Sequence, residues 1–244
     1  MYPVLQIGGL SIQTPGLALL AGIWIALDLV SKDAARHDEN AEHAYNAGFY
    51  ALIAGLIAAR LGFVIAHLDA YINSPLSVFS ILPGSALRPV GLAVGIAVWL
   101  GFLHRKKMLN LNVLDASARA LAVLAAAVAA ANFLSGDGYG VETGVPWAID
   151  LWSAPRHPTQ VYELLAALGV LAALWRWRDQ WSAPGTAFAV WVIGYGTARL
   201  LLESLRADSW IVFGNLRGVQ VVALVAIVAV LVLAARRAPA SRAV

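Results

Sequence analysis

Apolar stretches of about 20 residues recur along the whole chain, separated by short polar connectors, and this is the length of helix that crosses a bilayer. We predict seven membrane-spanning helices, approximately at residues 12–30, 45–67, 87–103, 114–134, 159–175, 185–205 and 217–235. Seven spans take up roughly 140 residues, which leaves too few for a separate soluble domain. We therefore expect residues 1–244 to form a single polytopic transmembrane domain of the all-α class.

The composition excludes two other classes of protein. Hydrophobic residues make up 60% of the 244 positions and charged residues only 13%, about half the usual share of charge. A soluble enzyme needs more polar surface than this, and a disordered chain has far fewer apolar residues. A net charge of +3 gives no reason to expect a nucleic-acid partner. The absence of Cys excludes disulfides, and the scattered His residues lack metal-ligand spacing, so we expect no metal and no cofactor.

The distribution of basic residues predicts the orientation of the spans. Under the seven-span reading, ten of the 17 Lys and Arg residues fall on one side, whereas Arg156, Arg206 and Arg217 fall on the other. Cytoplasmic loops carry the excess of positive charge, so the N-terminus is expected outside and the C-terminus in the cytoplasm. This pattern predicts a multi-pass protein of a bacterial cytoplasmic (inner) membrane.

Several polar side chains lie where a bilayer would make them costly, and such residues are candidate site residues by default. Arg60 lies within the second span, and Arg199 and Glu203 are spaced i, i+4 on one helix face. Five more crowd the outer start of the fifth span: Arg156, His157, Gln160, Tyr162 and Glu163. Guanidinium groups bind phosphate bidentately. Together these residues favour a site for a phosphate-bearing amphiphile toward the outer leaflet.

Simpler interpretations of the same residues stay open. Arg199 and Glu203 could form only a structural ion pair, and Arg156 and Arg206 could simply touch lipid phosphates. His157 precedes Pro158 at a helix start, where a capping role is as reasonable as a catalytic one. The Ala-rich run 118–131 is expected to serve close helix packing.

Two motifs resemble those of bacterial prolipoprotein diacylglyceryl transferases. The run from Arg156 to Glu163, RHPTQVYE, is similar to that family's R-H-P-[ST]-Q-x-Y-E, and the run from Gly194 to Arg206 is similar to its G-Y-G-x-x-R-x-x-x-E-x-x-R. Weaker similarities lie at Arg60, at Asn132 through Asp137, and at residues 218–220. The resemblance extends from about residue 10 to 235, and seven spans with an outside N-terminus are also the family's topology.

The resemblance implies a reaction and a set of site residues. The family transfers the diacylglyceryl group of phosphatidylglycerol to the lipobox Cys of an exported preprotein, so the implied partners are phosphatidylglycerol or a related phospholipid, a lipobox-containing preprotein and the bilayer. It implies that Arg60, Arg199 and Arg206 hold phosphate, with Glu203 orienting Arg199. The headgroup site would be lined by Asn132, Asp137, Arg156, Gln160, Tyr162, Glu163 and Tyr195.

The chain also departs from the family pattern. Where the family has a His before Gly-Gly, this chain reads Arg88-Pro89-Val90-Gly91, and Ala129 stands where the family has an Arg. Arg88 restores a positive charge and is included among the substrate-binding candidates, but a guanidinium is not a base near neutral pH. His157 is then the remaining outer His, so the predicted catalytic residues are His157, Arg199 and Glu203.

Three functions are compatible with these observations. The first is a divergent diacylglyceryl transferase. The second is a non-catalytic relative that binds phospholipid or preprotein, which the missing His and Arg would fit. The third is a transporter or channel, which is disfavoured because the cytoplasmic halves of the predicted spans are almost wholly apolar.

Overall fold

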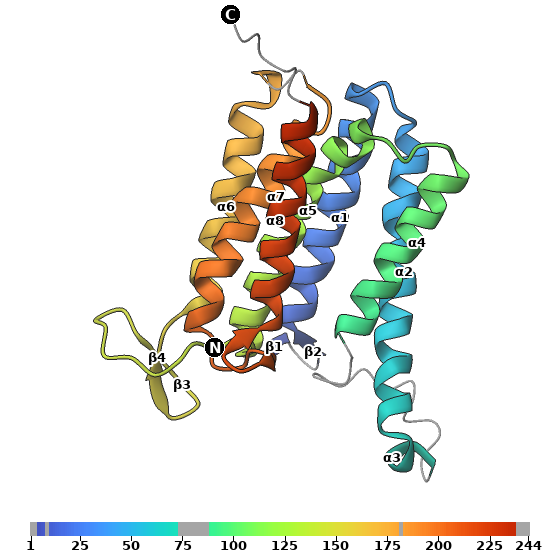
Figure 1. Ribbon diagram of the computed structural model, residues 1–244. Helices are drawn as coiled ribbons and strands as arrows, with labels where there is room; N and C mark the ends of the chain where they lie inside the picture. Colours follow the sequence, from blue (N-terminus) through green and yellow to red (C-terminus); the bar gives the residue numbers. More distant parts are fainter. Residues whose placement is uncertain (1–3, 8–9, 73–87, 181–182, 238–244) are drawn as a thin grey trace, which may run out of the picture. The chain divides into compact units, whose positions relative to one another are not determined.

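A computed structural model describes residues 4–7, 10–72, 88–180 and 183–237, and a helix coincides with each of the seven predicted stretches (Figure 1). These helices are α1 (Thr14–Arg36), α2 (Ala41–Ala66), α4 (Arg88–Arg105), α5 (Leu111–Ser135), α6 (Thr159–Arg176), α7 (Thr186–Leu202) and α8 (Gly218–Arg237). Residue 87, the predicted start of the third stretch, lies outside the described residues. Five helices in the described part, α1, α2, α5, α7 with its continuation to Leu205, and α8, are long and apolar enough to cross a membrane.

Three short antiparallel hairpins, which the sequence did not predict, accompany the helices. They pair β1 (Val4–Ile7) with β2 (Leu10–Gln13), β3 (Ile149–Leu151) with β4 (Ala154–Arg156), and β5 (Ile211–Phe213) with β6 (Leu216–Arg217). The short helices are α3 (Leu68–Ile72), η2 (Arg178–Gln180) and η3 (Glu203–Leu205). In β3–β4 the two turn residues, Trp152 and Ser153, both have positive φ, at 55° and 66°. A turn of this kind normally contains Asn-Gly, so the sequence lacks the usual hairpin signal.

The chain folds into two compact units, Val30–Val113 and the remainder of the chain, Met1–Leu29 with Leu114–Val244. Of the five helices long enough to cross a membrane, α5 is the most buried, and most of it belongs to the larger unit. Ala118 and Ala122 of α5 form a core cluster with Leu174 of α6. A Cβ on Gly22 of α1 would lie 2.1 Å from the Cβ of Ala127. The predicted packing role of the Ala-rich run is therefore confirmed, because small side chains let neighbouring backbones approach closely.

The N-terminus of α7 receives its cap from another helix. Its N-cap residue, Gly185, has no side chain to offer. Instead the buried carboxylate of Asp115, on α5, accepts hydrogen bonds from Gly185 N at 2.6 Å and Phe188 N at 2.8 Å. These bonds satisfy backbone donors that the first turn leaves free and place negative charge at the positive end of the helix dipole. Asp115 thus fixes where α7, which carries Tyr195 and Arg199, begins.

In the smaller unit α2 packs along α4 through glycine. A Cβ on Gly91 would lie 2.6 Å from the carbonyl oxygen of Gly55 and 2.7 Å from the Cβ of Ala59, and a Cβ on Gly55 would meet Gly91 O at 2.8 Å. Gly95 makes a similar approach to Ala51 O, at 3.1 Å. The two helices therefore meet backbone to backbone, as small residues spaced four apart allow in membranes.

We expect Gly91→Ala to destabilise the protein by about 1–3 kcal/mol, because the added methyl group forces the two backbones apart. Thermal unfolding in detergent micelles measures the effect as a lower midpoint temperature. Gly101→Ala on the same helix is the matched control, since a Cβ there meets no atom of the described residues within 4 Å. Equal midpoints for the two variants would contradict the close contact.

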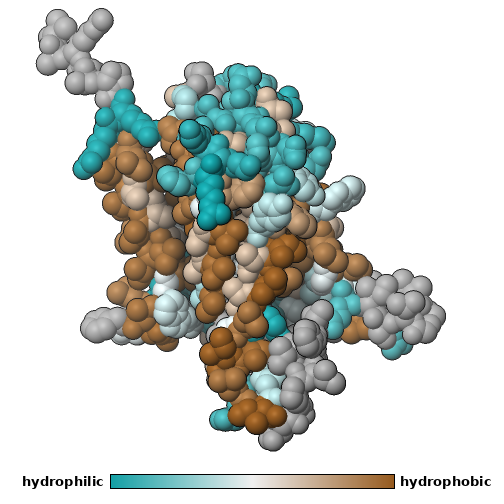
Figure 2. Space-filling model, turned by 90° about the vertical axis from the view of Figure 1, so that its right-hand side faces the viewer, coloured by the Kyte–Doolittle hydropathy of each residue, from teal (hydrophilic) through white to brown (hydrophobic). Residues whose placement is uncertain are grey.

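Hydrophobic residues cover much of the helix flanks and hydrophilic ones gather at helix ends (Figure 2). On α8, Val222, Leu224 and Val225 are more than half exposed. Such apolar side chains would be unfavourable in water and are the surface that a helix offers to lipid.

Candidate functional site

A network of buried ion pairs joins α6, α7 and the turn that follows α7. Glu163 of α6, whose side chain is 4% exposed, accepts hydrogen bonds at Oε1 from Arg199 Nη1 and, at 3.0 Å, from Arg206 Nη1. Arg199 Nη2 donates to Glu203 Oε2. The Glu203 side chain is only 2% exposed. One carboxylate thus bridges two guanidinium groups that stand seven residues apart in the chain.

Local geometry explains part of this network. Arg199 and Glu203 are four residues apart, so a helical turn brings their side chains onto one face. The chain then tightens into η3 and leaves the helix at Arg206, whose φ and ψ of −83° and 139° are extended. This change of direction returns the Arg206 side chain to Glu163.

Arg206 also connects the network to the segment after α5. Its Nε and Nη2 donate to the two carboxylate oxygens of Asp208, at 3.0 and 3.1 Å, and Gly138 N donates to Asp208 Oδ2 at 3.0 Å. Gly138 has φ +66°, and a Cβ there would lie 3.0 Å from Arg206 Nη2. The segment therefore needs glycine at this position, both for its backbone conformation and for its approach to the guanidinium group.

Two residues that the sequence-based site omits, Arg217 and Ser209, hold the turn in place. Arg217 Nη1 donates to the carbonyl oxygens of Glu203 and Arg206 and, at 2.9 Å, to Ser209 Oγ. Ser209 Oγ in turn donates to Glu203 Oε1 at 2.9 Å. In the sequence analysis Arg217 served only in the count of basic residues on the outer side of the membrane. Its place just before an apolar helix was the one signal available, and it does not reveal these long-range bonds.

The start of α6 is fastened to the same segment by two side chains. Thr159 Oγ1 donates to Gly138 O at 2.7 Å, and Gln160 Nε2 donates to Asp137 O at 3.0 Å. Gln160 is almost fully buried, and its Oε1 has no hydrogen-bond partner within the described residues. A buried acceptor of this kind is unfavourable unless a ligand or water supplies a donor.

His157 and Tyr162 form a separate polar group. Tyr162 OH accepts a hydrogen bond from Trp147 Nε1 at 2.6 Å and lies 3.4 Å from His157 Nδ1. His157 also fits tightly against Gly140, where a Cβ would lie 2.4 Å from His157 O. The structure therefore gives His157 a tyrosine neighbour, and its predicted role as a base stays a prediction.

Arg156, in strand β4, stabilises the β3–β4 hairpin through its side-chain hydrogen bonds. It donates to Leu151 O, Gly140 O and Glu142 Oε1 at 3.1 to 3.3 Å, and its guanidinium group lies over the Tyr139 ring. These bonds join β4 to β3 and to the segment before β3. They do not test the predicted contact of Arg156 with substrate, which stays a prediction.

The other predicted residues are distributed as follows. Asn132 is buried near the end of α5, and Tyr195 stacks on Trp191 one turn before Arg199. Arg60 belongs to the smaller unit, where its guanidinium group lies 5.5 Å from the Tyr71 ring centroid. Arg88 begins α4 in that unit, and its side chain lies outside the described part. The structure brings together Gln160, Glu163, Arg199, Glu203 and Arg206 with the 137–138 segment.

The network keeps Arg206 charged. Burial alone would lower the pKa of Arg206, but the negative charges of Glu163 and Asp208 outweigh this and raise that pKa above its ordinary value. Arg206 is therefore a permanent cation at physiological pH. Together with Arg199 it provides two convergent guanidinium groups, the arrangement that binds phosphate oxygens best.

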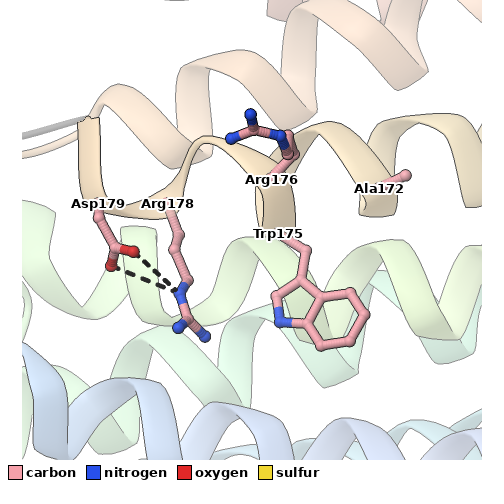
Figure 3. A pocket seen from close by; sticks show the side chains of 5 residues that line it. All are labelled: Ala172, Trp175, Arg176, Arg178 and Asp179. Atoms are coloured by element: carbon pink, nitrogen blue, oxygen red, sulfur yellow. Dashed lines mark hydrogen bonds and ion pairs between the residues drawn. The ribbon is translucent and has the colours of Figure 1, made fainter.

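An open surface pocket lies elsewhere, lined by Ala172, Trp175, Arg176, Arg178 and Asp179 (Figure 3). It sits around the C-terminal end of α6, whereas Glu163 lies in the first turns of that helix. At 1.5 Å per residue the two places are more than about 13 Å apart. Within the described ranges no group of three His, Asp or Glu side chains is arranged to hold a metal ion.

Comparison with known proteins identifies the family. The family model for prolipoprotein diacylglyceryl transferase matches residues 3–236. Relatives named phosphatidylglycerol–prolipoprotein diacylglyceryl transferase include one from Gloeobacter violaceus, 33% identical over 92% of this chain and 88% of its own length, and one from Clostridioides difficile, 26% identical over 90% and 88%.

The relative from Bordetella parapertussis is 34% identical over 164 residues, 65% of this chain, and the match spans 63% of that relative's length. Motifs, helices and family model thus agree along nearly the whole sequence, and the chain belongs to the prolipoprotein diacylglyceryl transferase family.

Proposed function

We propose that this protein transfers a diacylglyceryl group from phosphatidylglycerol to the thiol of a lipobox Cys in an exported preprotein, releasing glycerol phosphate. The observation that carries the proposal is the pair of convergent guanidinium groups of Arg199 and Arg206 on buried Glu163. Such a reaction develops negative charge on the departing phosphate. Permanent cations in a site shielded from water stabilise that charge far better than they would in water.

Several other parts of the site fit the same substrate. The Oε1 of buried Gln160, which has no partner among the described residues, can accept a hydrogen bond from a glycerol hydroxyl of the headgroup. Asn132, Asp137, Tyr162 and Tyr195 are proposed to line the headgroup site, with His157 and Arg156 at its edge. Arg60 and Arg88 are proposed to contribute further positive charge. The absence of Cys from the chain fits a reaction whose nucleophile is the substrate thiol.

We further propose that both units form a single domain with seven spans in a bacterial inner membrane, the N-terminus outside and the C-terminus cytoplasmic. Helices α4 and α6 would supply the two spans beyond the five longest. In this topology both ends of the 136–158 segment, and the 203–217 turn, face the outer leaflet, where exported preproteins arrive.

A transfer assay tests the proposed function. Purified protein in micelles that contain phosphatidylglycerol is incubated with a lipobox peptide, and mass spectrometry follows the peptide. We expect its Cys to gain the mass of a diacylglyceryl group. An unmodified peptide, with a family member that carries the His-Gly-Gly motif active in the same assay, would favour a lipid-binding protein without transferase activity.

A further inference from the structure

Glu163 occupies the place that a substrate phosphate requires. Its Oε1 is the point where Arg199 Nη1 and Arg206 Nη1 converge. An anion that accepts hydrogen bonds from these same two Nη1 groups would therefore take the position of this carboxylate oxygen. The other two acids of the network have additional attachments, because Glu203 is bonded to Ser209 and Asp208 to Gly138 N. Within the network, Glu163 accepts hydrogen bonds from the two arginine side chains alone, so it is the acid that an incoming anion can replace without breaking other bonds of the network.

The charge balance gives the same result. The network holds three carboxylates, those of Glu163, Glu203 and Asp208, and three guanidinium groups, those of Arg199, Arg206 and Arg217, so its charges are already balanced before an anion arrives. Adding a phosphate beside three ionised acids would bring several negative charges together at low dielectric. The repulsion falls if one carboxylate moves away and takes up a proton, because a neighbouring negative charge favours the neutral acid.

We infer that Glu163 is a resident anion which the substrate phosphate displaces, and that the displaced carboxylate then accepts the proton of the attacking thiol. The inference rests on the proposed function. The S–H bond breaks and the proton moves to Glu163, while a C–S bond forms to the glyceryl carbon. The C–O bond to phosphate breaks, and its electron pair leaves with glycerol phosphate, held by Arg199 and Arg206. Glu163 returns its proton to water when it resumes its place.

This exchange explains how the chain manages without the family's His before Gly-Gly. Phosphate binding itself frees the base, since it takes the guanidinium groups of Arg199 and Arg206 away from the Glu163 carboxylate. His157, by comparison, lies beside Tyr162 OH, and no bond within the described residues joins its ring to either arginine.

The test combines lipid binding with two acceptor peptides, one with Cys and one with selenocysteine at the lipobox position. A selenol is ionised at neutral pH and needs no base. For Glu163→Gln we expect several-fold tighter binding of phosphatidylglycerol, because the competing anion is gone. Transfer to the Cys peptide should fall about a hundredfold or more, and transfer to the selenocysteine peptide should stay close to that of the wild type.

Two further variants keep the inference falsifiable. Glu163→Asp retains a carboxylate with shorter reach, so we expect partial transfer to Cys and full transfer to selenocysteine. His157→Ala should lose no more with Cys than with selenocysteine. The inference is overturned if the selenocysteine peptide restores the transfer rate of His157→Ala and not that of Glu163→Gln. It is also overturned if Glu163→Gln binds phosphatidylglycerol more weakly than the wild type. Absence of transfer by the wild type with both peptides would refute the proposed function. The phosphatidylglycerol affinities of Glu163→Gln and the wild type would still show whether phosphate displaces the Glu163 carboxylate.

Discussion

Replacing Arg199 by alanine is expected to abolish transfer and to destabilise the protein by about 3–5 kcal/mol, because it leaves two buried carboxylates without their shared cation. Glu163 and Glu203 are 4% and 2% exposed, and Arg199 bonds to both. Arg199→Lys keeps the charge but cannot span the two acids with a planar fork. For that variant we expect a folded protein whose transfer rate is about a hundred- to a thousandfold lower.

Arg178→Ala is the matched control for Arg199. Arg178 pairs with Asp179 on the surface, where the acid side chain is 87% exposed, and such a pair contributes at most about 1 kcal/mol. Transfer rates, phosphatidylglycerol affinity and thermal unfolding in micelles distinguish the variants. If Arg199→Lys bound and transferred lipid like the control, Arg199 would not hold the phosphate.

The second large effect is expected at Gly140. A methyl group there would lie 2.4 Å from the carbonyl oxygen and 2.7 Å from the Cβ of His157, and backbone cannot yield as a flexible side chain does. Gly140 also pairs with Arg206 in an isolated β-bridge, and its carbonyl oxygen accepts from Arg156. Gly140→Ala should therefore push apart the segments that place Arg206 and the start of α6. We expect transfer to fall by at least about a hundredfold, as misplacement of about 1 Å does.

Gly144→Ala provides the comparison for Gly140. It lies four residues further along the same segment, and in the described part of the chain a Cβ there has no neighbour within 4 Å. We expect its transfer rate to match the wild type. Both variants are measured with the peptide assay, and phosphatidylglycerol binding shows whether the loss occurs at the lipid site. Wild-type transfer by Gly140→Ala would show that this contact does not position the site.

The sequence alone was sufficient for features that depend on neighbours along the chain. The length of the apolar stretches located each of the seven helices to within six residues at either end, because a helix of membrane-spanning length is specified by its own composition. The pairing of Arg199 with Glu203 followed from the helical repeat. Small residues in 118–131 predicted close packing, which their burial confirms.

Only the tertiary structure decided which polar groups meet. The bonds of Glu163 to arginines 36 and 43 residues away, the anchoring of the η3 turn by Arg217, and the capping of α7 by Asp115 depend on how each helix is rotated about its axis and where each connection returns. Hydropathy carries no information on that rotation. For the same reason the sequence identified the charged residues of this site one by one but not their partners. The tertiary structure shows that the Glu163 carboxylate is shared by Arg199 and Arg206.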